Sequence, residues 1–253
     1  MKSQLKFTPI TGMLAVALVL TTVGRAQDSA QIPAHGKMNT LFNGKNLKGF
    51  DTFLEKHSVN SDPDRVFQVE KGMLHISGAE MGGLVTQKEY ENYYLRAEFK
   101  WGEKMYEPRL GKARDSGIQY HITGPLVVWP RMMEFQVSEG STGDIWVIKG
   151  ASVVVRATKY DSTGDTPYIR IPRIGRGELQ NVTGFRQPQG EVEKPLGEWN
   201  VLELVADHDR VMQFVNGKLV NQGSNANTMR GKIDFQSEGA EVYFRKMKIA
   251  RLK

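Results

Sequence analysis

Strict alternation of apolar and polar residues over short runs is the feature that most limits how this chain can fold. In residues 95–101 (Leu-Arg-Ala-Glu-Phe-Lys-Trp), apolar side chains occupy every second position and charged side chains lie between them. Because successive side chains of a strand point to opposite faces, such a run predicts a half-buried β-strand. The same period recurs in residues 118–122, 133–137 and 233–236, and helical periodicity is almost absent.

Ten runs predict strands, and residues typical of turns separate them. Glu70-Lys71-Gly72 and Asn216-Gly217 predict hairpins, since Asn and Gly accept a positive φ. Many short strands at close spacing predict an all-β sandwich or barrel. The predicted strands are Phe67–Val69, Met73–Ser77, Tyr94–Trp101, Ser116–Ile122, Met133–Val137, Ala151–Val155, Trp199–Asp207, Val211–Val215, Gly231–Gln236 and Val242–Arg251.

Residues 1–26 have the pattern of a secretory signal peptide. Lys2 and Lys6 precede an apolar run from Met13 to Val23, and small residues surround the expected cleavage site after Ala26. The run is short for a membrane span, which needs about 20 residues. We therefore expect an exported protein, periplasmic or extracellular, with no integral membrane segment after cleavage. No cysteine follows the run, which excludes a lipid anchor.

The rest of the chain is predicted to be a flexible leader, residues 27–39, followed by a single domain, residues 40–253. Removing the three basic residues of the signal peptide lowers the net charge from +6 to +3. Such a balanced domain has no electrostatic feature that favours nucleic acid. The chain has no cysteine, so disulfides and thiolate chemistry are excluded and the hydrophobic core must hold the fold.

The polar positions of the alternating runs carry large hydrogen-bonding side chains. Gln recurs there three times although it has no preference for strands. Amide, carboxylate and imidazole groups beside Trp and Tyr suit the hydroxyls and ring faces of sugars. We therefore predict one sugar-binding sheet face, with a plain solvated face as the alternative. Its members are Arg96, Glu98, Lys100, Gln119, His121, Glu134, Gln136, Asp234 and Gln236.

Sequence motifs for several other chemistries are missing. The five histidines form no HExxH motif and no close-spaced pair, so a dedicated zinc site is not expected. The sequence has no G-x-S-x-G nucleophile elbow, and no G-x-G-x-x-G follows a predicted strand. The sequence therefore gives no motif that indicates a serine hydrolase of that type or a dinucleotide-binding domain.

Several segments, in order along the chain, resemble those of one protein family. Residues 41–50 match the opening LFNGKdLsGW, residues 82–90 resemble GgLlTtkeY, and residues 115–118 match NSGIf. Residues 134–137 match YEvQi, and residues 197–200 match GEWN. The set resembles the 3-keto-disaccharide hydrolase family over Leu41 to Leu252.

This resemblance implies a concanavalin-like jelly roll of two antiparallel sheets, exported by bacteria and acting on glycosides oxidised at C3 of the sugar. The chain departs from the family at Asp115, where Asn is usual, and in long insertions at residues 102–114 and 161–195. The expected activity is hydrolysis of glycosidic bonds of 3-keto sugars.

The 3-keto group makes the C2 proton acidic, so a base can remove it, the C1 substituent can leave by elimination, and water can add back. This chemistry needs a base, a donor or cation for the enolate oxygen, and an acid for the leaving group. We predict His121 or Glu134 as the base and Arg245 or Lys100 as the cation. The residues predicted to hold the substrate are Gln119, Gln136, Gln236, Glu98, Asp234 and Trp146.

Alternatives stay open at this point. A divalent cation held by Glu134 and Asp234 could replace the cationic side chain, although no ligand motif is present and no other cofactor is expected. A non-catalytic lectin-like module on the same fold is the main alternative to an enzyme, because fold alone does not decide function. A structural adhesin is a third interpretation, favoured only by a flat, solvated face.

Overall fold

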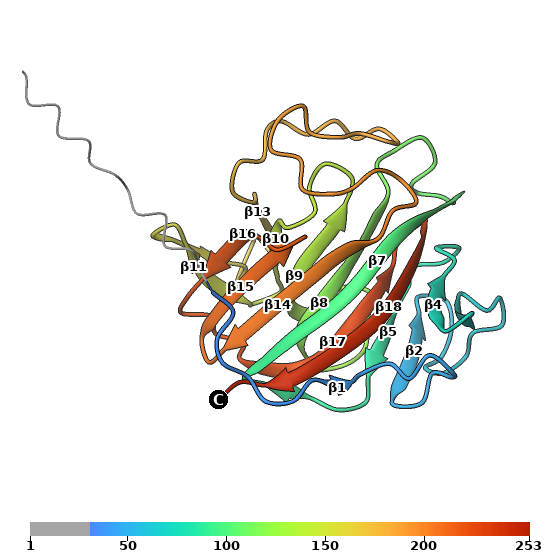
Figure 1. Cartoon of the computed structure of the whole chain (residues 1–253), viewed down its shortest axis with the longest axis horizontal. Helices are drawn as coiled ribbons and strands as arrows, with labels where there is room; N and C mark the ends of the chain where they lie inside the picture. The colour runs from blue at the N-terminus through green and yellow to red at the C-terminus, as the bar shows by residue number, and fades with distance from the viewer. Residues whose placement is uncertain (1–30) are drawn as a thin grey trace, which may run out of the picture. The chain divides into compact units, whose positions relative to one another are not determined.

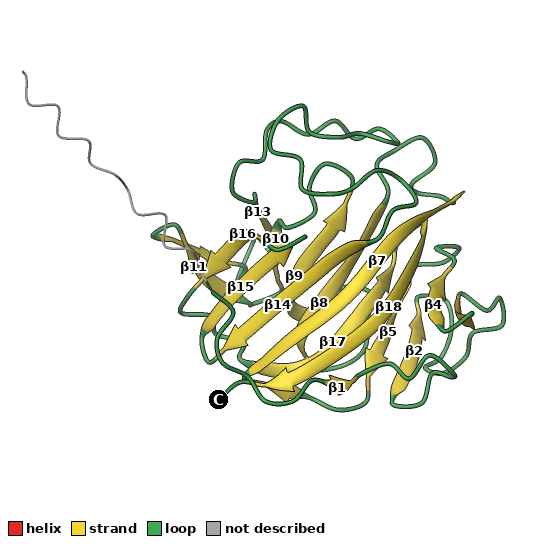
Figure 2. Ribbon diagram, viewed as in Figure 1, coloured by secondary structure: helices red, strands yellow, loops and turns green. Residues whose placement is uncertain are grey.

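A computed structural model describes residues 31–253, which form strands and loops without a helix. Two large antiparallel sheets pack face to face in this part of the chain (Figures 1 and 2). The all-β sandwich predicted from the alternation is therefore confirmed. The predicted signal peptide lies outside the described residues. Among residues 31–253, no helix has the length and apolar character needed to cross a membrane.

The first sheet is called the β7 sheet after its long central strand. Its strands are β1 (Asn39–Thr40), β3 (Phe67–Glu70), β4 (Met73–Ile76), β7 (Tyr93–Met105), β14 (Asn200–Asp207), β15 (Arg210–Val215), β16 (Lys218–Gly223) and β18 (Ala240–Arg251). They follow the order β16-β15-β14-β7-β18-β4-β3, and β1 pairs with β18.

The second sheet is called the β8 sheet. Its strands are β2 (Phe50–Leu54), β5 (Gly82–Thr86), β6 (Tyr90–Glu91), β8 (Asp115–Thr123), β9 (Arg131–Ser138), β10 (Ile145–Ile148), β13 (Tyr168–Ile171) and β17 (Arg230–Ser237). They follow the order β13-β10-β9-β8-β17-β5-β2, and β6 pairs with β17. A separate hairpin joins β11 (Ser152–Val155) to β12 (Thr158–Asp161).

The predicted strands and hairpins are present, and the turn chemistry explains the hairpins. Lys71 and Gly72 have φ of 49° and 79° between β3 and β4, and Asn216 and Gly217 have φ of 52° and 77° between β15 and β16. Two successive positive φ values give the turn twist that matches a hairpin. Strands β1, β2, β5, β6, β10, β12 and β13 were not predicted. Strand β5 is buried at every position, so it lacks the alternation on which the prediction rested.

Part of the predicted flexible leader is ordered by strand pairing. Asn39 lies opposite Ile249 of β18. The Gly36 N–H donates a hydrogen bond to the Arg251 carbonyl at 2.8 Å. The compact unit begins at Ile32 rather than at residue 40, because this backbone pairs along the edge of β18.

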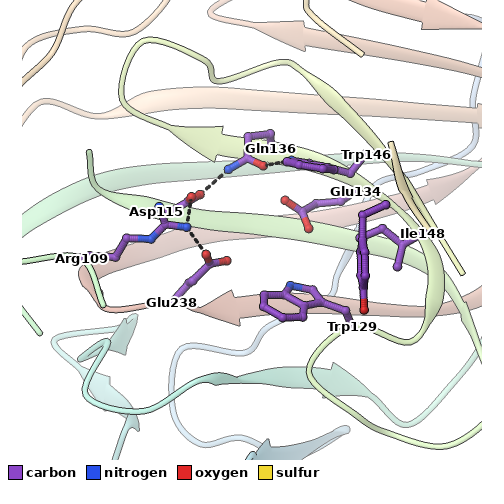
Figure 3. Close-up of a pocket in the computed structure, with 9 residues that line it drawn as sticks. Arg109, Asp115, Trp129, Glu134, Gln136, Trp146, Ile148 and Glu238 are labelled. Carbon is purple, nitrogen blue, oxygen red and sulfur yellow. Dashed lines mark hydrogen bonds and ion pairs between the residues drawn. The ribbon is translucent and has the colours of Figure 1, made fainter. Parts of the chain in front are cut away.

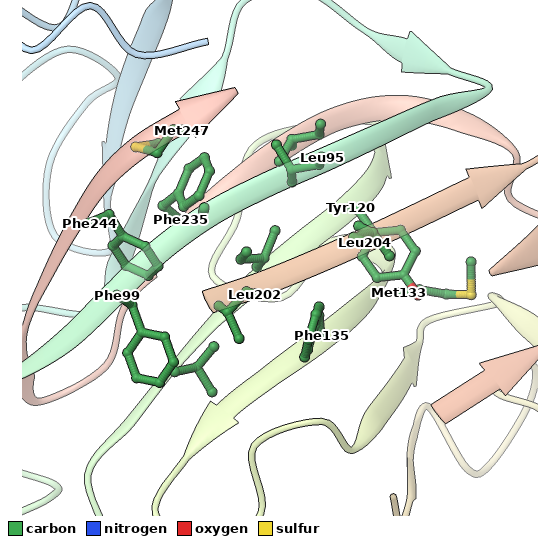
Figure 4. Packing of buried hydrophobic residues seen from close by; sticks show 14 of the residues in the cluster. Leu95, Phe99, Tyr120, Met133, Phe135, Leu202, Leu204, Phe235, Phe244 and Met247 are labelled. Atoms are coloured by element: carbon green, nitrogen blue, oxygen red, sulfur yellow. The ribbon is translucent and has the colours of Figure 1, made fainter. Parts of the chain in front are cut away.

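The hydrophobic core lies between the two sheets and is built from their alternating apolar residues (Figure 4). Phe244 of β18 and Phe235 of β17 meet edge to face across the sandwich, with ring centroids 5.2 Å apart. Since one face of each sheet builds this core, each sheet has a second, outer face. The polar positions of the alternating strands therefore fall on two outer faces rather than one.

Two long loops meet at one end of the sandwich, where Figure 1 shows residues 172–199 arching over the strands. The Thr183 hydroxyl donates to the Lys112 carbonyl at 2.8 Å, which joins this loop to the one between β7 and β8. Glu139 accepts hydrogen bonds from the Arg114 backbone at 2.9 Å and from the Gly184 N–H at 2.9 Å. The loops thus brace each other beside the β8 sheet.

Candidate active site

A pocket of about 380 Å³ opens on the outer face of the β8 sheet. Its floor comes from side chains at alternating positions of neighbouring strands: Trp146 of β10 lies opposite Glu134 of β9, and Gly117 of β8 lies opposite Gln136. Loop residues close its sides. The lining residues are Arg109, Asp115, Trp129, Glu134, Gln136, Trp146, Ile148, Tyr168 and Glu238 (Figure 3).

One end of the pocket is a connected polar network. The Trp146 Nε1–H donates to the Gln136 amide oxygen, and the Gln136 amide nitrogen donates to Asp115. The Arg109 guanidinium forms ion pairs with both Asp115 and Glu238. The Arg109 Nε is buried and has no partner among the described residues. It is therefore a spare donor next to two carboxyl groups.

Glu134 lies in the middle of the pocket and is 3% exposed. Burial raises its pKa well above the usual range, the charges of Glu238 and Asp115 raise it further, and Arg170 opposes them. A Cβ at Gly117 would come within 2.8 Å of the Glu134 carboxyl carbon. Glycine at this cross-strand position therefore leaves the room that the Glu134 side chain occupies.

Asp115 and Glu238 repel each other and share one cation. Burial raises the pKa of Asp115 well above its usual range, the Glu238 charge adds to this, and Arg109 opposes it. Burial likewise raises the pKa of Glu238 against the pull of Arg109. Because one guanidinium forms ion pairs with both carboxyls, the protonation of Asp115 and that of Glu238 depend on each other.

The other end of the pocket is aromatic. Tyr168 lies opposite Ile148 at the edge of the sheet, and its ring meets Trp129 edge to face, with centroids 6.0 Å apart. Trp129 and Tyr168 are 37% and 42% exposed. These rings border the pocket. The Trp146 ring also lines the pocket, and the Arg170 guanidinium lies over it at 5.4 Å from its centroid.

Six of the ten side chains predicted to form the site share the outer face of the β8 sheet. Glu134, Gln136 and Trp146 line the pocket. Gln119 lies opposite both Glu134 and Asp234, and Gln236 follows two positions later on β17. The second group (Gln119, Asp234 and Gln236) is buried next to the pocket without lining it.

These neighbours retain unused hydrogen-bonding capacity. Asp234 Oδ1 and both amide atoms of Gln236 are buried without a partner among residues 31–253. A Cβ at Gly83 would lie 2.1 Å from Asp234 Oδ1, so glycine is required for the Asp234 carboxyl to lie over β5. Burial raises the pKa of Asp234 well above its usual range. The floor beside the pocket is thus polar and buried.

His121 does not share a face with Glu134, and the prediction that it does is wrong. The pairing of β8 with β9 is irregular between Tyr120 and Thr123, and His121 has φ of 56°. Such a bulge adds one residue and reverses the alternation. The ring instead contacts Tyr93 of β7, inside the sandwich, at a centroid distance of 5.7 Å.

The buried position of His121 also changes its protonation. Its Nδ1 lies 2.7 Å from the Thr228 carbonyl oxygen. Burial lowers the pKa of His121 to about 4, against the effect of that hydrogen bond. A neutral imidazole enclosed by the core has no access to a sugar in the pocket.

Glu98, Lys100 and Arg245 lie on the outer face of the β7 sheet, so the prediction of one common face is also wrong for them. Glu98 accepts hydrogen bonds from Arg245 at 2.7 Å and from Lys246 at 3.2 Å. Arg245 lies 3.8 Å from the centroid of the Trp199 ring. The physical reason is that alternation separates two faces of a strand without showing to which sheet the strand belongs.

The described residues contain one group of three potential metal ligands with closely spaced ligand atoms: His57, Asp64 and Glu80. Neither Glu134 nor Asp234 belongs to it. A cation between Glu134 and Asp234 therefore stays a prediction from the sequence.

Comparison with known proteins identifies the family. The family model described as the 3-keto-alpha-glucoside-1,2-lyase-like domain matches residues 37–250. The chain belongs to this family. The resemblance recognised in the sequence is therefore confirmed, and membership of the family places the chain among carbohydrate-active proteins. No curated protein matches the chain.

Solved structures agree on the fold of this family member. A candidate glycosyl hydrolase from Parabacteroides distasonis is 21% identical, with a TM-score of 0.55 over 85% of this chain and 94% of that chain. A second from the same organism is 20% identical, with a TM-score of 0.52 over 86% and 100%. The β-glucanase of Bacillus licheniformis is 10% identical, with a TM-score of 0.50 over 86% and 99%. The concanavalin-like jelly roll is thereby confirmed.

Sequence reasoning missed three charged residues of the pocket. Glu238 continues the two-residue period of Asp234 and Gln236, and Asp115 has the same period with Gly117 and Gln119, so alternation could have found both. Arg109 lies in the loop between β7 and β8, where no pattern marks it.

Proposed function

We propose that this family member cleaves 3-keto-glycosides by removing the C2 proton, eliminating the C1 substituent and adding water. The observation that carries the proposal is Glu134, a buried carboxyl with a raised pKa in a sugar-sized pocket that also holds a guanidinium with a spare donor. Perturbed carboxyls in a pocket are typical of acid–base sites.

Glu134 is assigned as the base. A carboxylate with a raised pKa is a stronger base than an exposed one, which suits a C–H made only moderately acidic by the neighbouring ketone. The electrons of the C2–H bond form the C1=C2 double bond as the C1–O bond breaks. Glu134 then carries the proton that the leaving oxygen needs, and water adds OH to C1 and H to C2.

Arg109 is assigned as the cation that stabilises the enolate oxygen, the role predicted from the sequence for Arg245 or Lys100. Its guanidinium lines the pocket and can donate a hydrogen bond to the C3 oxygen, on which negative charge develops as C2 loses its proton. Donors fixed in advance in a dry site stabilise such charge strongly.

Turnover in D₂O tests this reaction. Purified protein is incubated with methyl 3-keto-glucoside and, separately, with unoxidised methyl glucoside. The proposal predicts cleavage of the keto sugar alone, with deuterium at C2 of the product above the level that the product acquires without protein. Cleavage of the unoxidised glucoside at a similar rate would show an ordinary glycosidase. Binding without cleavage would favour the lectin-like module.

A further inference from the structure

The order of side chains along the pocket sets the direction in which a substrate lies. Three residues of β9 mark this order. Gln136 lies at the polar end with Asp115, and Glu134 lies two residues earlier in the chain, in the middle of the pocket. Met132, two residues earlier again, lies opposite Ile148 and thus next to the aromatic end. Figure 3 shows the same order, with Glu134 between the Arg109 end and Ile148. The pocket therefore has a polar end, a base and an aromatic end in sequence.

The reaction proposed above needs three groups in that same order. C3 carries the oxygen that becomes negative, C2 carries the proton that is removed, and C1 carries the substituent that leaves. With the C3 oxygen at Arg109 and C2 at Glu134, the C1 substituent points toward Trp129 and Tyr168.

We infer that Trp129 and Tyr168 form a leaving-group subsite for a ring-shaped substituent, either a second sugar or an aryl group, rather than a short alkyl chain. This inference rests on the proposed function, because the reaction decides which end takes the substituent. An aromatic pair set edge to face provides flat apolar surface, against which sugar C–H groups and aryl rings pack.

The strand and the loop that carry the two rings are anchored to the β8 sheet. Tyr168 begins β13 and pairs with Ile148 on a regular strand. Trp129 lies in the loop between β8 and β9, where Leu126 packs on the small apolar cluster that includes Met132 and Ile148. The exposure of both rings, 37% and 42%, leaves surface for a ligand to cover.

Kinetics with three 3-keto-glucosides test the inference: methyl, phenyl and glucosyl. The proteins are wild type, Trp129→Ala, Trp129→Phe and a control, Ile174→Ala, which removes an exposed apolar side chain outside the pocket lining. For Trp129→Ala we expect kcat/KM to fall by about tenfold with the phenyl and glucosyl compounds and by less than about twofold with the methyl compound. Trp129→Phe should recover part of the loss, and Ile174→Ala should match wild type.

Equal losses with all three compounds, or no loss with any, would overturn the subsite. If wild type cleaves none of them, the proposed reaction fails and binding decides the subsite alone. Calorimetry then compares phenyl glucoside with methyl glucoside. Tighter binding of the phenyl compound that Trp129→Ala abolishes would support the subsite, and equal affinities would overturn it.

Discussion

On the outer face of the β8 sheet Glu134 is buried among other acids, whereas on the outer face of the β7 sheet Glu98 is surrounded by cations. Glu134 has a raised pKa because burial and the charges of Glu238 and Asp115 act together. At Glu98 burial acts in the same direction, but hydrogen bonds from Arg245 and Lys246 outweigh it and lower the pKa. Two carboxyls on the outer faces of the two sheets thus differ in their capacity to accept and release a proton.

The difference comes from what covers each face. On the β8 sheet Asp115 and Glu238 are buried, and both form their ion pair with the same guanidinium, that of Arg109. The β7 face stays partly open, and Arg96 and Arg245 are about one-third exposed there. An acid whose charge is fully compensated holds structure together, while an under-compensated buried acid is available for chemistry. Matched variants on the two faces test this difference.

The largest expected effect is that of Glu134→Gln. Removing the base should lower kcat on a 3-keto-glycoside by about 10²–10⁴-fold, because proton transfer in the transition state is lost. Melting temperature should change little or rise, since the variant removes a buried acid. The matched control, Glu98→Gln, should keep kcat within about twofold, and similar losses in both variants would erase the contrast.

Arg109→Met should lower kcat by about 10²-fold, the usual cost of removing one donor to a developing oxyanion. Arg245→Met removes a guanidinium of the β7 face and should leave kcat unchanged. The measurement is single-turnover kinetics, with circular dichroism to show that both variants fold. A larger loss of rate in Arg245→Met than in Arg109→Met would show that the cation of the reaction is on the β7 sheet and that the assignment of Arg109 is wrong.

Gly117→Ala tests the position of Glu134 without changing its chemistry. The new Cβ would lie 2.8 Å from the Glu134 carboxyl carbon, so the side chain must move. We expect kcat to fall by about tenfold, because a misplaced base reacts slowly. Gly102→Ala is the counterpart on the other sheet, where the Cβ would meet Glu241 Oε2 at 2.2 Å. Gly102→Ala should lower the free energy of unfolding and leave kcat unchanged.

Alternation and turn residues are local signals, so the sequence predicted the sandwich, most of its longer strands and the pocket members Glu134 and Gln136. It could not predict which sheet each strand joins, since that depends on pairing between residues far apart in the chain. Lys100 and Gln119 have equally good alternation and end on different faces. His121 was misplaced by a bulge that no local pattern marks, and Arg109 reaches the pocket from an irregular loop.

The smallest effect concerns His121, for which we predict a structural role. Its folded pKa of about 4 lies below the usual 6.5, so the unfolded chain binds the proton first as the pH falls. Stability should therefore decrease from about pH 6.5 to pH 4, by on the order of 3 kcal/mol from this group.

Urea unfolding at pH 7 and pH 4.5 measures this dependence. His121→Gln should reduce the difference in the free energy of unfolding between the two pH values and keep kcat within about threefold. Loss of turnover without loss of stability in His121→Gln would return His121 to the site as a base.

A crystal structure of Glu134→Gln with an intact 3-keto-glucoside bound tests most directly whether the β8-sheet pocket is the active site. We predict density for the sugar in the β8-sheet pocket, with the C3 oxygen at Arg109, C2 facing residue 134 and the C1 substituent against Trp129. Density on the β7 sheet beside Trp199, with the pocket empty, would show that the substrate binds on the other sheet and that the proposed active site is wrong.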